Sequence, residues 1–219
     1  MNELLKINNL DVQFDTDEGR ITAVENVSLS VKQGEVLGIV GESGSGKSVT
    51  AKAIMQLNPG NTIYNEDAEV IIDGENVIKF TSKEDLKKIR GGKVSMIFQE
   101  PMASFAPAIK IGDQMVEQLL LHKNIKKEEA KSISLDMLTR VGITDTEKRF
   151  NQYAFELSGG MRQRAMIAMA LSTMPKLLLA DEPTTALDVT IQAQVLKLMK
   201  DIIKEYKMGV IFITHDLGV

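Results

Sequence analysis

The residues with the clearest chemistry form the run Gly41-Glu42-Ser43-Gly44-Ser45-Gly46-Lys47-Ser48. This run fits the G-x-x-x-x-G-K-[ST] pattern of a phosphate-binding loop, or P-loop. Its glycines let backbone N–H groups turn around phosphate oxygens, and the start of a following helix adds partial positive charge. In this pattern Lys47 reaches the β- and γ-phosphates, and the Ser48 hydroxyl ligates Mg²⁺. The run predicts a nucleotide site; the alternative is a glycine-rich turn without a ligand.

Two adjacent carboxylates, Asp181 and Glu182, follow the apolar run Leu177–Ala180. A carboxylate at the end of a strand beside a P-loop can hold the hydration shell of Mg²⁺, a role for Asp181. A second carboxylate can polarise an attacking water, a role for Glu182. The pair indicates nucleotide hydrolysis; the alternative is a strand that ends in a solvated acidic turn.

The elements that must position these residues alternate between strand and helix. The apolar run Val36–Val40 predicts a buried strand before the P-loop, and the run Val49–Met55 predicts a helix after it. Further strands are predicted at Glu69–Ile72, Val94–Phe98, Lys176–Ala180 and Val210–Ile213, a hairpin turn at Asp15–Gly19, and helices at Met161–Thr173 and Ile191–Tyr206. This order predicts an α/β fold with a mostly parallel sheet.

Residues 111–142 have helical periodicity, with Ile111, Met115 and Leu119 on one face. We expect one domain over residues 1–219, with a core of residues 1–100 and 175–219 and a helical subdomain of residues 101–174. The alternative is that these helices simply cover the sheet.

Composition excludes several classes of protein. The chain has 219 residues, a formal net charge of −4 and no cysteine, so disulfides and thiolate metal sites are excluded and non-specific nucleic-acid binding is not indicated. No apolar run approaches the roughly 20 residues of a membrane helix, and the first residues lack the apolar region of a signal peptide. We expect a cytosolic protein whose membrane association goes through a partner.

The stretch Leu157-Ser158-Gly159-Gly160-Met161-Arg162-Gln163-Arg164 resembles the LSGGQ-x-Q signature of ATP-binding-cassette (ABC) ATPases, with Met161 in place of glutamine. Ser158 is a good helix N-cap, and the two glycines expose backbone N–H groups at a helix start. The resemblance implies that this surface faces the γ-phosphate bound by the P-loop of an opposite subunit.

The same resemblance gives roles to residues elsewhere. Gln99 is similar to the Q-loop glutamine, a Mg²⁺ and water ligand, Asp188 to the D-loop aspartate at the dimer interface, and His215 to the switch histidine that senses γ-phosphate. Phe14 is expected to stack on adenine; alternatively it is a core residue, and Arg20 or nothing covers the base. The expected residues are Glu182, His215 and Gln99 for catalysis, Ser48, Gln99 and Asp181 for the metal, and Gly41, Ser43, Gly44, Gly46, Lys47, Ser48, Val49, Phe14, Ser158, Gly159, Gly160 and Asp188 for ATP.

Four stretches narrow the resemblance to ATP-binding subunits of dipeptide and oligopeptide importers: Phe98–Ser104, Ile111–Gln114, Gly159–Arg164 and Asp188–Gln194. The related nickel importers share this pattern. Phe105–Ala108 and Ala154–Glu156 depart from the family's usual Leu-Asn-Pro and Pro-His-x, near the expected contact with a membrane subunit. These departures bear on the identity of the cargo.

The resemblance implies a P-loop NTPase (RecA-like) fold with an N-terminal antiparallel β subdomain and an inserted helical subdomain. It implies that the chain binds ATP and Mg²⁺ and lies peripherally on the cytoplasmic face of the membrane. The implied partners are a second ATPase subunit (a copy or a paralogue), integral-membrane permeases and, indirectly, an extracytoplasmic solute-binding protein, with no nucleic acid. Because the family continues beyond the position of His215, we expect an N-terminal portion of a longer subunit. Other readings are a non-transport ABC ATPase and an ATP-binding module without turnover.

Overall fold

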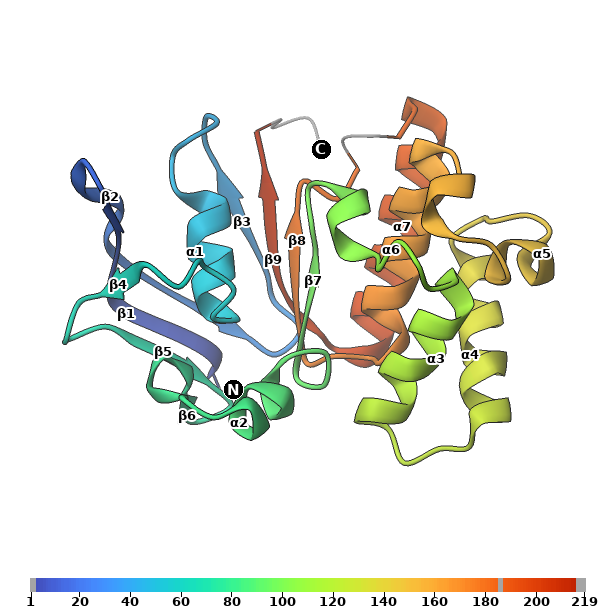
Figure 1. The fold of residues 1–219 in the computed structure, drawn as a ribbon, viewed down its shortest axis with the longest axis horizontal. Coiled ribbons are helices and arrows are strands. Elements are labelled where there is room, and N and C mark those ends of the chain that lie inside the picture. Colours follow the sequence, from blue (N-terminus) through green and yellow to red (C-terminus); the bar gives the residue numbers. More distant parts are fainter. Residues whose placement is uncertain (1–2, 185–186, 216–219) are drawn as a thin grey trace.

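Two β-sheets with different strand patterns frame the chain (Figure 1). The computed structural model describes residues 3–184 and 187–215. The first sheet is antiparallel, in the order β2-β1-β5-β6 with β4 paired to β1. Its strands are β1 (Glu3–Thr16), β2 (Gly19–Lys32), β4 (Thr62–Tyr64), β5 (Glu69–Ile72) and β6 (Glu75–Asn76). The predicted turn is confirmed, since Thr16 pairs with Gly19 where β1 turns into β2.

The second sheet is parallel, in the order β3-β9-β8-β7. Its strands are β3 (Val36–Val40), β7 (Val94–Ile97), β8 (Leu177–Asp181) and β9 (Gly209–Thr214), all four of which the apolar runs predict to within two residues. Because the strands are parallel, their carboxyl ends share one edge, at the top of Figure 1. Ligand sites of open α/β sheets lie outside this edge.

Strands β7 and β8 are buried on both faces, which explains why they are continuously apolar. Strand β3, which was predicted to be buried, is exposed on one face at Val36, Gly38 and Val40, because it is the edge strand of the sheet. Successive side chains of a strand point to opposite faces. In β8, Leu177 and Leu179 join the core cluster shared with the antiparallel sheet, whereas Leu178 and Ala180 join the cluster shared with the helices. Both clusters therefore meet at the central strands.

Helix α1 (Lys47–Ile54) lies between the two sheets and contributes Ala51, Ala53 and Ile54 to their shared core (Figure 1). The other helices are α2 (Lys83–Ile89), α3 (Ile111–His122), α4 (Lys127–Arg140), α5 (Thr146–Phe150), α6 (Gly159–Ser172) and α7 (Val189–Tyr206), with short 3₁₀ turns at Val77–Lys79, Pro101–Ser104 and Ala154–Glu156. Helices α3 to α6 share one core cluster with β8 and α7. The division into subdomains stays a prediction, because this core is continuous with that of the sheet.

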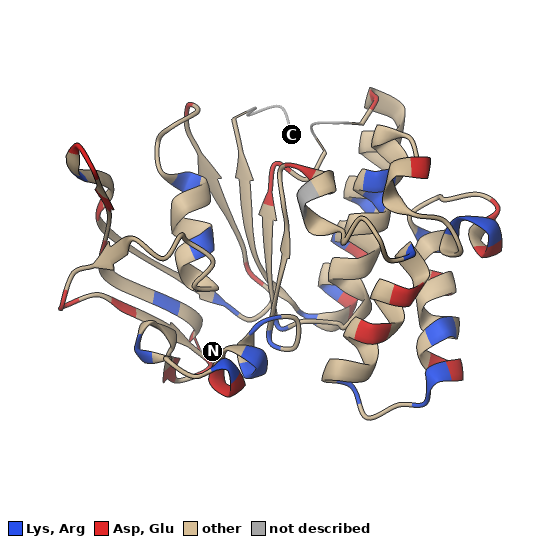
Figure 2. Ribbon diagram, in the orientation of Figure 1, with Lys and Arg blue, Asp and Glu red and all other residues tan. Residues whose placement is uncertain are grey.

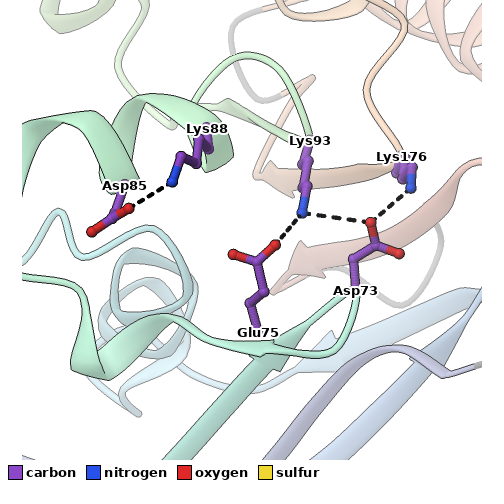
Figure 3. A network of polar contacts seen from close by, with 6 residues as sticks. All are labelled: Asp73, Glu75, Asp85, Lys88, Lys93 and Lys176. Carbon is purple, nitrogen blue, oxygen red and sulfur yellow. Dashed lines mark hydrogen bonds and ion pairs between the residues drawn. The ribbon is translucent and has the colours of Figure 1, made fainter.

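A network of ion pairs ties the antiparallel sheet to the amino ends of β7 and β8 (Figure 3). Asp73, in the turn after β5, lies 2.7 Å from the Lys176 ammonium and 3.5 Å from that of Lys93, and Lys93 also pairs with Glu75 at 2.8 Å. The hydrogen bond from Lys176 lowers the pKa of Asp73. This network lies at the edge of the parallel sheet opposite the carboxyl ends, so it holds the two sheets together away from the predicted site.

Charged residues are spread over the outer helices, and acidic residues stand at the upper end of β8, facing the carboxyl edge (Figure 2). No helix within the described residues is both long enough and apolar enough to cross a membrane.

Candidate active site

The P-loop connects β3 to α1 at the carboxyl edge of the parallel sheet. Gly44 and Gly46 have left-handed φ angles of 84° and 86°. Helix α1 begins at Lys47, inside the motif and two residues before the predicted start at Val49. The N–H groups of its first residues have no partner within the helix and are free for anions. The ammonium of Lys47 lies over the loop, 2.7 Å from the carbonyl oxygen of Gly41 and 2.6 Å from that of Glu42.

A cavity of about 150 Å³ opens over this loop. It is lined by Ala23, Ser43, Gly44, Ser45, Gly46, Lys47, Ser48, Val49, Gln99 and Glu182. The structure thus brings P-loop residues together with Gln99 and Glu182, which are distant in sequence. Two lining residues were missed by the sequence reasoning: Ser45, a variable position inside the motif, and Ala23 of β2, whose type and spacing give no signal.

Asp181 is the last residue of β8 and is only 3% exposed. Burial raises the pKa of this carboxyl, while a hydrogen bond with Ser48 lowers it. Among the described residues, the Oδ1 atom of Asp181 has no hydrogen-bond partner. A buried carboxylate oxygen without a partner, beside a serine hydroxyl, matches the oxygen ligands that Mg²⁺ prefers, so these residues fit the ion.

Glu182 lies at the centre of the predicted catalytic residues. Its side chain is 13% exposed; Gln99 donates its Nε2 hydrogen to one carboxylate oxygen at 3.3 Å, and Nδ1 of His215 lies 2.9 Å from the other. Its backbone has a left-handed φ of 47°, and its N–H donates to the carbonyl of Ile213 in β9. A carboxylate held on both oxygens at the cavity wall is positioned to orient a water molecule and accept its proton.

The signature residues lie outside this cavity. Ser158 caps α6, as its residue type predicts, with its hydroxyl accepting from the Met161 N–H at 3.3 Å. Ser158 and Gly159 are exposed and Gly160 is half-buried. Asp188 is exposed and caps α7 in the same way, accepting from the Ile191 N–H. Thr185 and Ala186 of the predicted D-loop, and Asp216 after His215, lie outside the described residues.

Phe14 is half-buried in β1, opposite Ile21 of β2 and Thr62 of β4. It packs against the core cluster of the antiparallel sheet and does not line the cavity over the P-loop. Arg20 is exposed in the hairpin. Adenine stacking on Phe14 stays a prediction.

Comparison with known proteins agrees with this geometry. Residues 24–185 match the family model described as "ABC transporter". The chain belongs to the ABC transporter family. It is 51% identical over 216 residues to the oligopeptide transport ATP-binding protein OppD of Bacillus subtilis, covering 99% of this chain and 60% of that protein. It is 48% identical over 218 residues to the dipeptide transport ATP-binding protein DppD of Lactococcus lactis, covering 99% of this chain and 62% of that one.

The fold of this ABC transporter chain is that of solved ATP-binding cassettes. The dimeric structure of a post-hydrolysis state of the cassette MJ0796, bound to ADP and Pi, matches with a TM-score of 0.87 and 30% identity, covering 98% of this chain and 89% of that one. The predicted P-loop NTPase fold, with antiparallel and parallel sheets and packed helices, is confirmed. The chain spans about three fifths of the length of the two peptide-transport relatives.

Proposed function

We propose that this chain binds ATP and hydrolyses it to ADP and phosphate, as the ATP-binding subunit of an importer. One observation carries the proposal: at the wall of the cavity that the P-loop forms, the Glu182 carboxylate accepts a hydrogen bond from Gln99 with one oxygen and contacts His215 with the other. A nucleotide-binding loop alone serves many reactions. A carboxylate held beside it favours hydrolysis by water.

The P-loop binds the phosphates through its backbone N–H groups and the first turn of α1. Lys47 exchanges its contacts with the carbonyls of Gly41 and Glu42 for phosphate oxygens, since an ammonium gains more from an anion than from neutral acceptors. Ser48 and Asp181 would hold Mg²⁺, directly or through its water. When bound, this ion supplies charge that neutralises the phosphate oxygens.

Glu182 accepts a proton from the attacking water. The water oxygen forms a bond to the γ-phosphorus, the bond from that phosphorus to the bridging oxygen breaks, and ADP takes the released electron pair. Gln99 and His215 orient the carboxylate through one oxygen each, so that it does not turn away from the water. General-base assistance of this kind contributes roughly 10²- to 10⁴-fold in rate.

The exposed signature residues point to a second chain. Ser158 and Gly159 are exposed at the start of α6 and do not line the cavity over the chain's own P-loop. Asp188 is likewise exposed, at the start of α7. We propose that they complete the nucleotide site of a partner cassette, a copy or a paralogue. The solved MJ0796 cassettes, which share the fold at 30% identity, are described as dimeric.

We further propose that the cargo is a peptide. The support is the names of the relatives, which are oligopeptide and dipeptide transport ATP-binding proteins at about 50% identity. In such an importer this chain would sit on the cytoplasmic face of the membrane against permease subunits, with a solute-binding protein outside. Peptide-dependent ATP hydrolysis in proteoliposomes that contain the permeases and the binding protein tests this, with nickel as the competing cargo.

The test of hydrolysis is Glu182→Gln. Mg-ATP affinity should persist, whereas phosphate release should fall by roughly 10²-fold or more, because an amide cannot accept the proton of the water. Glu84→Gln is the matched control, since Glu84 is an exposed residue of α2, remote from the cavity. Equal phosphate release by the wild type and Glu182→Gln would show that Glu182 is not the base.

A further inference from the structure

Gln163 makes a buried contact that the reaction described above does not use. It lies near the start of α6 and is 0% exposed. Its Nε2 atom donates to the carbonyl oxygen of Pro183 at 2.5 Å. Because that carbonyl can only accept, the amide must present its nitrogen to it, which fixes the orientation of the side chain.

Pro183 directly follows Glu182, so this contact acts on the backbone of the proposed base. Proline has no N–H, so its carbonyl is the polar group through which this residue's backbone can be held. On the other side, the N–H of Glu182 donates to Ile213 of β9. Glu182 is therefore held between β9 and α6, in the left-handed conformation that a side chain rarely adopts.

Packing alone does not account for an amide at position 163. Its Oε1 atom is buried and has no partner among the described residues. A buried acceptor without a hydrogen bond costs free energy, and an apolar side chain of similar size avoids that cost. The useful half of this amide is the nitrogen that holds Pro183.

We propose that Gln163 is a positioning residue for Glu182: by holding the Pro183 carbonyl, it fixes the carboxylate at the distance from Gln99 and His215 that hydrolysis needs. The proposal rests on the proposed ATP hydrolysis. Gln163 also lies near the start of the helix whose exposed N-cap, Ser158, is proposed to face the nucleotide of a partner.

The first test is Gln163→Met, which keeps the length of the side chain and removes the donor. The kcat for ATP should fall by roughly 10- to 100-fold, because a misplacement of about 1 Å has effects of this size, while KM for Mg-ATP stays within about twofold. Ser172→Ala is the matched control, since Ser172 is buried on the same helix and bonds only to the Met169 carbonyl in the part of the chain described. It should leave both constants unchanged.

A double-mutant cycle separates positioning from a general loss of structure. In the Glu182→Gln background there is no base left to position, so Gln163→Met should reduce the residual rate by less than about twofold. A further tenfold loss there, or an unchanged kcat in the single variant, would overturn the proposal. If Glu182→Gln itself retains full activity, it is the proposed function that fails.

Gln163→Glu provides a second variant in case Gln163→Met does not fold. Burial keeps the introduced carboxyl protonated at low pH, where its O–H can donate to Pro183, and the donor is lost when it ionises. The kcat of Gln163→Glu relative to the wild type should therefore be highest at acid pH and fall as pH rises. A ratio that does not change between pH 5.5 and 9, with the fold intact by circular dichroism, would contradict the role of the donor; the pH limits follow from the roughly 3 to 5 units by which burial can raise a carboxyl pKa.

Discussion

Gly46 tests whether the P-loop is shaped by its contact with the antiparallel sheet. This glycine has a φ of 86°, and a Cβ placed on it would lie 2.6 Å from the carbonyl oxygen of Ala23 and 3.1 Å from Cγ2 of Val24. Both neighbours belong to β2, which β1 holds through the pairing of Val12 with Val24. Gly46→Ala must therefore displace the loop or the strand.

The expected size of the effect follows from two contributions. A left-handed φ costs a residue with a side chain roughly 1–2 kcal/mol. Forcing a methyl group against a fixed backbone oxygen adds roughly 1–3 kcal/mol, so we expect Gly46→Ala to lower the free energy of unfolding by about 3 kcal/mol. Gly44→Ala is the matched control, because Gly44 has a φ of 84° but nothing within 4 Å of its Cβ position. It should cost only the backbone contribution, about 1 kcal/mol.

The measurement is urea unfolding of both variants and the wild type without nucleotide, compared through the extrapolated free energy of unfolding. The difference of about 2 kcal/mol between the variants corresponds to roughly 30-fold in the unfolding equilibrium. Equal losses in the two variants would refute the argument, because the contact with Ala23 would then not be what excludes a side chain at Gly46.

Three further predictions concern charged groups. Lys47→Ala should weaken Mg-ATP binding by roughly 10²-fold or more, because a charge-assisted contact to the phosphates is lost; equilibrium titration with labelled ATP measures it. Asp181→Asn should raise the free energy of unfolding of the nucleotide-free protein at pH 7 by about 1 kcal/mol, because burial raises the pKa of Asp181 and makes its ionised form unfavourable. This stabilisation should vanish below about pH 4, and the same variant should weaken Mg²⁺-dependent nucleotide binding. A lower melting temperature of Asp181→Asn at pH 7 would contradict the argument. Asp73→Asn should lower the free energy of unfolding by less than about 1 kcal/mol at pH 7, because the ion pair with Lys176 is partly exposed. Since the pKa of Asp73 is lowered, the stabilisation by this pair is present above about pH 4 and is lost at lower pH. Urea unfolding at several pH values tests this.

The parallel strands could be predicted because each is a short apolar run, although one face of β3 is exposed. Strands β4 and β6 could not, since they have three and two residues and exist only through their pairing with β1 and β5. Helix α2 buries only Ile89, so it shows no apolar periodicity. A signal was nevertheless present: Ser82 caps α2 and also bonds to Asp85, an arrangement typical of a helix start.

The site residues within the P-loop can be predicted from their spacing in the sequence. The proximity of residues that follow separate strands cannot be predicted in this way. Gln99 and His215 reach Glu182 because β8 pairs with β7 on one side and with β9 on the other, with Asp181 opposite Ile213. Sequence order alone does not specify that register. Ala23 enters the cavity through the packing of a hairpin, which has no local signature.

For Asp181 and Glu182, the sequence predicts which groups are present, and the backbone conformation determines where each carboxylate lies. Their types and their place after an apolar run predict a metal-holding and a proton-accepting carboxylate. The backbone makes the two different: Asp181 keeps its strand position and is buried beside Ser48, with a raised pKa. One residue later the left-handed φ of Glu182 turns the chain, so this carboxylate lies at the cavity wall between Gln99 and His215. Because such a conformation is costly for a side chain, it persists only where neighbours enforce it. Here the Glu182 N–H donates to Ile213 and the following residue, Pro183, accepts from Gln163, so we propose that the position of the Glu182 carboxylate depends on both contacts.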